Sequence, residues 1–408
     1  MPRSALTTAA TLAAVAIVVA ACGSSGGGSN KNGGGGSTAT GSTWNIGSIG
    51  SYTGPFAGGL GPTEQTINAW AKWTNAHGGV NGHKINLINL DDKANPATSA
   101  ADAKQLIDQD HVIAIVADDS IASSAWASYA EQKGVPVIGA PFDAIFSTSP
   151  DFFPNGTTLQ TVQFALMDEA AKAGHPNFAL FYCAEAATCA NSVDLAKGLA
   201  GKANAKLAYS AKVSASAPDY TAQCLGAKQA GVDSLEIGQV SATSLKIIDS
   251  CAQQGYHPQL VGNGGTVSTA WAADKNADGT VIIEPDFPDF DTSNQGEQDF
   301  QAAMKQYASS VLTSDGFGAN EAETWTAGLL FAAAAKAGNL GDNPTPADVI
   351  NGLYALKGET LGGLVPPLTY AHGNHSVNCW FVGKITSGKF TTPQGLKVDC
   401  MPGVPASQ

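Results

Sequence analysis

Apolar runs and amphipathic stretches alternate along the chain from residue 44 onward. The apolar runs predict strands, and the stretches in which apolar residues recur with helical spacing predict helices. In the first helical stretch Ile67, Trp70 and Ala71 fall on one face. A later one opens with Asn95 as a cap and Pro96 at the first helical position. This first series predicts strands at 44–49, 84–90, 112–116 and 135–138, and helices at 62–75, from 95 onward and at 120–133.

A second series of the same kind begins at residue 178. It predicts strands at 178–182, 207–213, 234–237 and 259–261, and helices at 191–203, 220–230 and 244–254. Two consecutive series of this kind predict an α/β protein with two doubly wound parallel sheets, each with helices on both faces. Ligands of such sheets bind beyond the carboxyl ends of the strands, so two facing lobes predict a site between them.

The N-terminal residues predict a secretory signal. Arg3 supplies a positive start, and the apolar run at 9–21 is shorter than the roughly 20 residues that a membrane-spanning helix needs. We therefore expect a signal peptide at 1–21. No later run is long enough to cross a membrane.

The apolar run ends in the sequence VAAC, whose last residue is Cys22. This ending resembles the bacterial lipobox, in which the cysteine is lipidated after cleavage. We expect Cys22 to be the membrane anchor and the glycine- and serine-rich segment 22–43 to be a flexible tether. The predicted location is the extracytoplasmic face of the cell membrane. The alternative is an ordinary signal peptide with an incidental cysteine.

Composition limits the partners. The chain has 408 residues, 43% of them hydrophobic, which is enough for two domains of ordinary size. Its formal net charge is −13, and an acidic protein lacks the basic stripe that nucleic acid requires. We expect no nucleic-acid partner.

Apart from Cys22 the chain has six cysteines, and an even number in an exported protein suggests disulfides. The helices at 220–230 and 244–254 should lie side by side on one sheet face, which would bring their cysteines together. Another pair closes a short loop, and a third flanks a hairpin-like stretch. The expected disulfides are Cys224–Cys251, Cys183–Cys189 and Cys379–Cys400. Buried thiols are the alternative.

Catalytic motifs are missing from the sequence. There is no HExxH or GxSxG, and the near-P-loop at 383–390 has Phe390 where a hydroxyl residue would hold magnesium. The histidines at 372 and 375 lie in a glycine-rich turn without helical spacing. Glu321 and Glu323 are interpreted as solvated or capping charges of a helix. We expect no enzyme activity, no cofactor and no metal site.

Several stretches together resemble a known family. They are SYTGPFA at 51–57, NAHGGVNGHKI at 75–85, the aspartates at 91–92, a Gly-Tyr after a helix at 255–256, and 363–370. As a set they resemble the leucine/isoleucine/valine-type substrate-binding proteins of ABC transporters. The resemblance runs from residue 44 to about residue 400. It implies a type I periplasmic-binding fold, with two doubly wound lobes joined by a three-segment hinge that closes on a small ligand.

The resemblance also implies domain limits and a function. Lobe 1 would hold 44–161 with 285–361, and lobe 2 would hold 162–284 with 362–403. The protein would be a monomer that captures a small polar ligand, an amino acid or a related compound, and delivers it to an ABC permease. A sensor of the same fold that signals to a membrane partner is the alternative.

Candidate ligand-binding residues in lobe 1 follow from the resemblance. Ser120, at the expected start of a helix, would hold the ligand's carboxylate together with backbone N–H groups. Asp119 precedes it, and a carboxylate there would repel an anion. Asp143, beside Phe142, matches a position that contacts the ligand's ammonium group. The loop residues Tyr52 and Phe56 complete the set.

Lobe 2 departs further from the family. Gln239 stands where the family often has an aromatic residue. The loop at 262–265, which contains Gly264, lacks the acidic residue that binds the ammonium group. Asp143 could replace that acid from the opposite lobe. Otherwise the ligand is not an α-amino acid, and amides, small acids and aromatic compounds are the alternatives.

Overall fold

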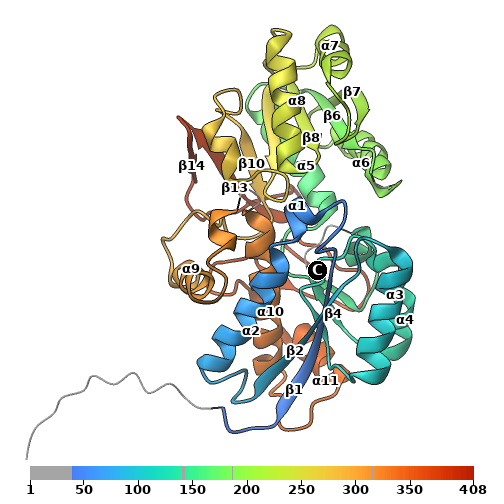
Figure 1. Cartoon of the computed structure of the whole chain (residues 1–408), viewed down its shortest axis with the longest axis vertical. Coiled ribbons are helices and arrows are strands. Elements are labelled where there is room, and N and C mark those ends of the chain that lie inside the picture. The colour runs from blue at the N-terminus through green and yellow to red at the C-terminus, as the bar shows by residue number, and fades with distance from the viewer. Residues whose placement is uncertain (1–38, 140–142, 186, 315–316) are drawn as a thin grey trace, which may run out of the picture. The chain divides into compact units, whose positions relative to one another are not determined.

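The computed structural model describes residues 39–139, 143–185, 187–314 and 317–408, and Figure 1 shows their arrangement. The predicted signal peptide, the lipidation site Cys22 and most of the predicted tether lie outside the described residues. Within the described part, no helix is both long and apolar enough to pass through a membrane.

The first sheet is parallel and follows the order β2-β1-β3-β4-β5. Strands β1, β3, β4 and β5 are mostly buried, as parallel strands covered on both faces must be, whereas the edge strand β2 is mostly only partly buried. Their bounds are β1 (Thr43–Gly50), β2 (Lys84–Asp91), β3 (Ile115–Val116), β4 (Val137–Gly139) and β5 (Phe152–Pro154). Strand order reverses beside β1, where β2 lies on one side and β3 on the other, as in a doubly wound sheet.

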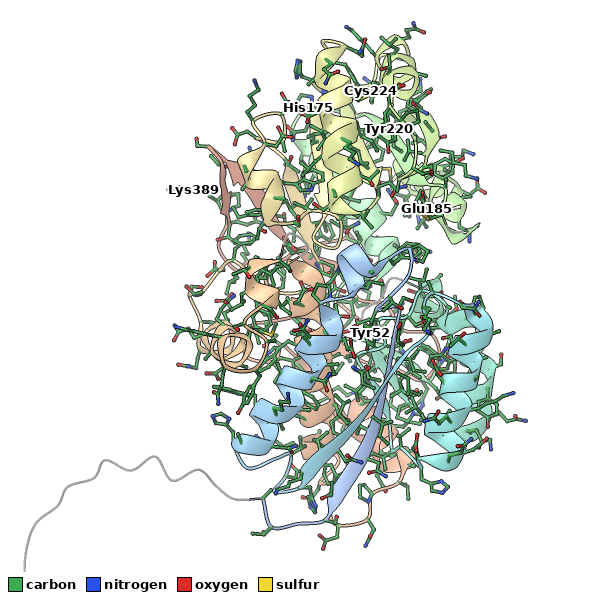
Figure 2. The ribbon with its side chains drawn as sticks, in the orientation of Figure 1. Tyr52, His175, Glu185, Tyr220, Cys224 and Lys389 are labelled. Atoms are coloured by element: carbon green, nitrogen blue, oxygen red, sulfur yellow. A yellow bond between two sulfur atoms is a disulfide. The ribbon has the colours of Figure 1, made fainter. Side chains whose placement is uncertain are left out.

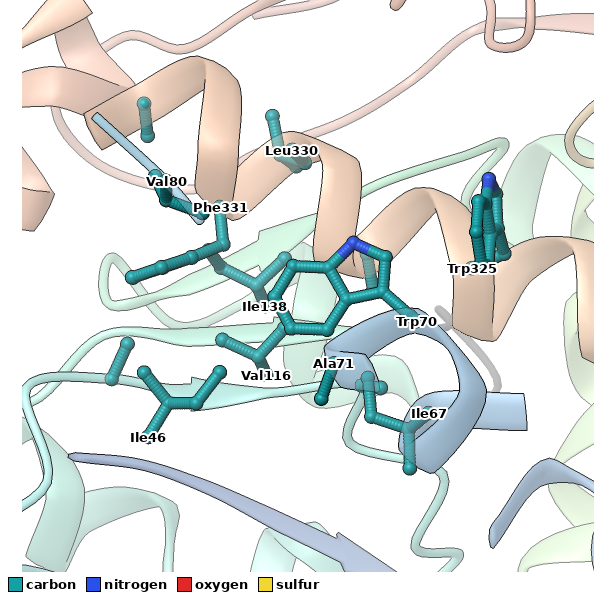
Figure 3. Close-up of a cluster of buried hydrophobic side chains, with 14 of the residues drawn as sticks. Ile46, Ile67, Trp70, Ala71, Val80, Val116, Ile138, Trp325, Leu330 and Phe331 are labelled. Atoms are coloured by element: carbon teal, nitrogen blue, oxygen red, sulfur yellow. The ribbon is translucent and has the colours of Figure 1, made fainter. Parts of the chain in front are cut away.

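Helices cover both faces of this sheet. Helices α2 and α10 lie on one side of β1 and β2, and α3 and α4 lie on the other (Figure 1). The helices associated with this sheet are α1 (Ala57–Leu60), α2 (Thr63–Ala76), α3 (Pro96–Lys104), α4 (Ala127–Lys133), α9 (Gln295–Tyr307), α10 (Ala319–Ala337) and α11 (Pro346–Ala355). Figure 3 shows the core under α2 and α10, where the Trp70 ring lies among Ile67, Val116 and Phe331.

The second sheet follows the order β14-β13-β10-β9-β8-β6-β7. Strands β6 to β10 are parallel to one another, and β13 and β14 are added antiparallel at the β10 edge. The strands are β6 (Asn177–Cys183), β7 (Lys206–Val213), β8 (Ser234–Gly238), β9 (Gln259–Asn263), β10 (Val281–Glu284), β13 (Cys379–Thr386) and β14 (Lys389–Thr391). A further strand, β15 (Asp399–Cys400), pairs with β13.

Apolar cores lie on both faces of the second sheet. One packs α7 (Thr221–Gln229) and α8 (Ser241–Gln253), and the other packs α5 (Leu159–Lys172) and α6 (Asn191–Ala200). The disulfide Cys224–Cys251 joins α7 to α8, and Cys224 is visible on α7 in Figure 2. Cys183–Cys189 closes a short loop after β6, and Cys379–Cys400 joins β13 to β15. These are the pairs that the sequence predicted.

The chain passes from the first sheet to the second after β5, returns after β10, and crosses again before β13. Hydrogen bonds tie the crossing segments together: the Thr157 hydroxyl donates to Pro285 O at 3.0 Å and to Cys379 O at 2.6 Å. Leu364 and Tyr370, beside the small β11 (Lys357–Glu359) and β12 (Leu368–Thr369) sheet, pack in the core of the first sheet. The exact limits of the two lobes stay a prediction.

The predicted fold class is confirmed, and most predicted elements occur within a few residues of their expected bounds. One prediction is wrong. The helix expected at 120–133 is only α4, which begins at Ala127 after a 3-10 turn at Ser123–Ala125. The reason is local: Asp118 accepts hydrogen bonds from the Ser120 N–H and the Ser123 hydroxyl, and these bonds compete with helix formation.

Candidate functional site

The N-terminal half of α10 is the place where loops from both sheets meet. From the first sheet, the Thr324 hydroxyl donates to Asp119 Oδ2 at 3.0 Å, and Asn320 Nδ2 donates to Gly59 O at 3.0 Å. From the second sheet, Gly264 lies so close to Ala319 that an added Cβ would overlap the Ala319 side chain. The carboxyl ends of β3 and β9 therefore face the same helix end, where doubly wound sheets bind ligands.

Acidic side chains are concentrated at this junction and along the crossing segment that follows β10. All are almost completely buried; Glu323 is 0% exposed and Glu284 is 2% exposed. The buried acids of this region are Asp118, Asp119, Glu284, Asp286, Asp289, Glu321 and Glu323. Burying a carboxylate is costly unless it is paired or hydrogen-bonded, so each of these groups requires a physical explanation.

Some of these carboxyl groups have partners. Glu321 Oε2 accepts the Gly318 N–H at 2.7 Å and so caps the start of α10. Asp286 accepts from the Thr326 hydroxyl and from Asn155 Nδ2. These bonds satisfy one oxygen of each group and leave the other without a partner.

The oxygens without a hydrogen-bond partner gather around the start of α10 and the end of β10. Both carboxyl oxygens of Glu323 are unpaired, and Glu284 Oε2 points at Gly264, where an added Cβ would overlap it. The unpaired oxygens of the junction are Asn155 Oδ1, Asn263 Oδ1, Glu284 Oε2, Asp286 Oδ1, Asn320 Oδ1, Glu321 Oε1, Glu323 Oε1 and Glu323 Oε2. This set contains amide oxygens as well as carboxyl oxygens, so the N–H and hydroxyl groups of the described residues leave several acceptors of this region without a donor.

Burial and mutual repulsion raise the pKa of these acids. Burial raises the pKa of Glu323 well above its ordinary value, and the charges of Asp286 and Asp119 raise it further. Burial also raises the pKa of Asp119 and of Asp289 to about 7, against the hydrogen bonds that Asp119 accepts. These two groups therefore change their protonation state near neutral pH, whereas an exposed aspartate does so near pH ~4.

Ser120 is buried at 4% exposure beside this cluster, but its polar groups are already engaged. Its hydroxyl donates to Asp92, and its N–H donates to Asp118 Oδ1 at 3.3 Å. Because α4 begins at Ala127, Ser120 does not stand at the helix N-terminus that the sequence predicted. Its assignment as a carboxylate-binding residue stays a prediction, without the helix end on which that prediction relied.

Asp143 has a local structural role. Its carboxylate accepts the Ser124 hydroxyl at 2.7 Å and the Ile145 N–H at 3.1 Å, and it caps the 3-10 turn at Ala144–Ser147. The neighbouring Phe142 lies outside the described residues. A ligand contact by Asp143 stays a prediction, and such a contact would compete with the cap.

Tyr52 and Phe56 belong to the loop after β1. The buried Tyr52 hydroxyl donates to Asn89 Oδ1 at 2.7 Å, and Tyr52 is labelled beside the first sheet in Figure 2. Burial raises its pKa well above the ordinary tyrosine value, and the charge of Asp119 adds to this. Phe56 is half-buried, and its carbonyl accepts the Leu60 N–H at 2.9 Å. The backbone of this loop therefore leads to Gly59 and its contact with Asn320.

Gln239 lies at the end of β8 and is 6% exposed. Its Nε2 donates to Glu185 Oε2 at 2.8 Å and to Val213 O at 3.0 Å. Glu185 is exposed and is labelled in the second sheet's half of Figure 2. Of the two residues predicted in lobe 2, Gly264 lies against Ala319 of α10. The Gln239 side chain instead donates its hydrogen bonds to residues that follow strands of the second sheet or end them.

Sequence reasoning missed the acids that dominate this site. The interpretation of Glu323 as a solvated charge is wrong, because the side chain is fully buried; Glu321 does cap the helix. Glu284 was not singled out at all. Signals were present: Glu284 ends an apolar strand, and Glu321 and Glu323 interrupt an otherwise apolar helix. An acid inside an apolar pattern is either buried or misassigned.

Comparison with known proteins gives a consistent result. The sequence pattern of the periplasmic binding protein family matches residues 43–389. An amino acid binding protein of Pseudomonas aeruginosa is 39% identical over 71 residues. That stretch is 17% of this chain and 19% of the relative's length.

Solved structures share the fold at low sequence identity. An ABC transporter substrate binding protein of Aeropyrum pernix has a TM-score of 0.75 and 18% identity, and the match covers 88% of this chain and 96% of that one. A branched chain amino acid ABC transporter protein of Thermus thermophilus with bound valine has a TM-score of 0.75 and 16% identity, covering 87% and 96%. A solute binding protein of R. palustris in complex with benzoate has a TM-score of 0.69 and 18% identity, covering 89% and 99%.

Proposed function

This chain belongs to the periplasmic binding protein family, and from that premise we propose that it is the extracytoplasmic solute receptor of an ABC transporter. Its family is one of binding proteins rather than enzymes. The observation that carries the proposal is the junction at α10, where Asp119 of the first sheet and Gly264 of the second approach the same helix end. A small ligand held there contacts both sheets at once.

Binding at this junction would be coupled to movement of the two sheets. The crossing segments are joined by backbone and hydroxyl hydrogen bonds, such as that from Thr157 to Pro285, and they form the natural hinge. A ligand that bridges Asp119 and Glu284 would favour the closed arrangement, because only that arrangement offers both groups. The permease would then recognise the closed, loaded protein.

The N-terminal sequence supports a membrane anchor for this receptor. Cleavage before Cys22 and lipidation of its thiol would hold the protein at the outer face of the membrane, and the segment 22–43 would let the folded part reach the permease. The receptor would act as a monomer, with one ligand for each closed pair of lobes. Replacing Cys22 by alanine should release the protein from the membrane fraction.

The proposed ligand is a small polar molecule, either an amino acid or a related compound. One relative of the same fold carries valine and another carries benzoate, so the fold itself does not fix the ligand. Among the residues predicted from sequence, we propose Asp119 and Gly264 as ligand neighbours, because both lie at the α10 junction.

Ligand-dependent stabilisation of the full chain, purified in detergent, tests the proposal. The panel should contain branched-chain amino acids, amides, amines, aromatic acids and small carboxylates. A ligand present at about 100 times its Kd stabilises the folded state by about 2.7 kcal/mol, which a thermal melt resolves. In cells, deletion of the protein should abolish uptake of the same compound. Binding without any loss of uptake would favour the sensor alternative.

A further inference from the structure

The junction at α10 has several buried oxygens that no N–H or hydroxyl group of the described residues satisfies, and this deficit indicates what its ligand must bring. The unpaired atoms there are all oxygens, contributed by carboxyl groups and by the amides of Asn155, Asn263 and Asn320. Unpaired buried donors elsewhere in the described chain include Trp70 Nε1 and Trp380 Nε1, which lie in apolar cores. A buried acceptor without a donor is destabilising, so several in one place favour a ligand that donates.

Cationic side chains do not neutralise the cluster. The chain's only arginine is Arg3, within the predicted signal peptide. Ion pairs of the described lysines lie elsewhere: Lys133 pairs with Asp108, and Lys197 pairs with Asp194. The neighbours that act electrostatically on Glu323 are Asp119, Asp286, Glu284 and Glu321, all of them acidic. Among the described residues no ion pair reaches these acids, so each proton that they release leaves a negative charge that a cationic ligand can offset.

Three hydroxyl groups in or near this region that could hold a ligand carboxylate already hold protein carboxylates. The Ser120 hydroxyl donates to Asp92, the Ser123 hydroxyl donates to Asp118, and the Thr324 hydroxyl donates to Asp119. A carboxylate of the ligand would have to displace one of these and then lie beside the acids. An α-amino acid or an aromatic acid is for this reason a poor match to the site.

From these contacts we infer that the ligand is an organic cation that carries ammonium or amidinium N–H donors and no carboxylate, and that Glu284, Glu321 and Glu323 bind it. The inference rests on the proposed function, because it specifies the ligand of the same receptor site. Glu284 is placed at the centre of the set: it lies on the second sheet, and its unpaired oxygen points at Gly264 beside Ala319 of α10. Charge-assisted hydrogen bonds from one cation would satisfy oxygens of both sheets.

A single metal ion is a weaker match to this arrangement. Among the residues that the structure describes, no three His, Cys, Asp or Glu side chains converge closely enough to coordinate one ion. The unpaired oxygens instead extend from Asn263 and Glu284 to Glu323. An elongated cation with donors at more than one point fits such a spread of acceptors.

Charge-matched probes test the inference directly. Isothermal titration of the full chain in detergent should compare 1,5-diaminopentane, 5-aminopentanoate and glutarate, with shorter and longer members of each series, and with leucine, benzoate and calcium chloride. These series keep the carbon chain and change only the charged ends. We expect the diamines to bind tightest and the dicarboxylates not to bind.

The variant Glu284→Gln should weaken diamine binding by about 10- to 100-fold, because it removes one charged acceptor and keeps the side-chain volume. Glu323→Gln provides a second variant should the first fail to fold. The matched control is Asp194→Asn, which removes one negative charge from an exposed position of α6 and should leave the affinity unchanged.

The outcomes separate the inference from the proposed function. Tight binding of leucine, benzoate or glutarate that survives Glu284→Gln would overturn the inference and leave the receptor function intact. Binding of calcium in place of every organic cation would overturn it as well. Failure of every compound of every charge to bind would overturn the inference and the receptor function together.

Discussion

The two halves of helix α10 lie in contrasting surroundings. Its C-terminal half places Leu330, Phe331 and Ala334 in the core of the first sheet, where they pack against α2 and β4 (Figure 3). Its N-terminal half holds Glu321 and Glu323, buried just as deeply but with oxygens that no donor satisfies. Both halves are excluded from water, so burial alone does not distinguish a stabilising region from a functional one.

The difference lies in what each half gains from being buried. Apolar side chains are stabilised by leaving water, at about 25 cal/mol per Å² of buried surface, and need nothing further. A buried carboxyl group is destabilising until a partner arrives, and the partner can come from outside the chain. The C-terminal half should therefore govern folding stability, and the N-terminal half should govern binding at some expense of stability.

The largest expected effect comes from the apolar half. Trp70 is 0% exposed, and its ring lies so close to Gly328 of α10 that an added Cβ there would overlap it. Trp70→Ala should lower the free energy of unfolding by about 3–5 kcal/mol, since it leaves a large cavity between α2 and α10. Urea unfolding measures this loss. The control is Trp73→Ala on the same helix, where the ring is only half-buried and packs at a tilt against the His77 ring. Equal losses of stability in the two variants would contradict the comparison.

The next effect concerns the contact between the two sheets. A methyl group at Gly264 would overlap both Glu284 and Ala319, so Gly264→Ala should cost about 1–3 kcal/mol and weaken ligand binding. The matched control is Gly238→Ala at the end of β8, where the nearest atom to the new methyl is Phe181 O at 3.5 Å. Chemical unfolding and ligand titration of both variants provide the readout. A Gly264 variant as stable and as active as the Gly238 variant would show that the loop does not contact α10 in solution.

Sequence patterns predicted the apolar region far better than the acidic one. The face of Ile67, Trp70 and Ala71 was visible from helical spacing, because the same rule of burial holds at each of these positions. The cap formed by Asn95 was equally visible, since its hydrogen bonds to Ala97 and Thr98 are local. Such features depend on residues that are close together in the chain, so they can be predicted from a short stretch of sequence.

The acidic region depends on contacts between distant residues. Glu284 and Gly264 come together with Ala319 only after both sheets have formed, and no local pattern records that meeting. The rule that charged residues lie at the surface then gave the wrong environment for Glu323. The helix predicted at 120–133 was wrong at its start for a related reason. The side chains of Asp118 and Ser120 accept hydrogen bonds from nearby backbone N–H groups, and these bonds compete with helix formation.

The acidic half should give the ligand-free protein an unusual dependence of stability on pH. Asp119 and Asp289 have pKa values of about 7 when folded, against an ordinary value of 3.8, so between these values the folded state holds more protons than the unfolded state. Stability must then fall as pH rises through 7, by about 1.4 kcal/mol for each such carboxyl between pH 6 and pH 8.

Thermal melts of the ligand-free chain at pH 6, 7 and 8 measure this trend. His375 acts in the opposite direction, because burial lowers its pKa, but it is one group against several acids. A ligand that supplies donors should reduce the slope, since it stabilises the ionised carboxylates. A flat profile, or stability that rises toward pH 8, would mean that the acids are exposed to water in solution.

The smallest predicted effect isolates one of these carboxyl groups. Asp119→Asn keeps an oxygen that can accept from the Thr324 hydroxyl but cannot ionise. The asparagine cannot ionise in either state, whereas the aspartate of the parent loses its proton more readily in the unfolded state than in the folded one. The stability advantage of the variant over the parent should therefore grow with pH, by about 1.4 kcal/mol between pH 6 and pH 8. The pair of unfolding curves at the two pH values is the measurement.

Asp108→Asn is the control, because Asp108 is exposed and its carboxylate is paired with Lys133. The same gain at pH 8 in both variants would show that it comes from lowering the net charge rather than from relieving a buried carboxylate at the α10 junction.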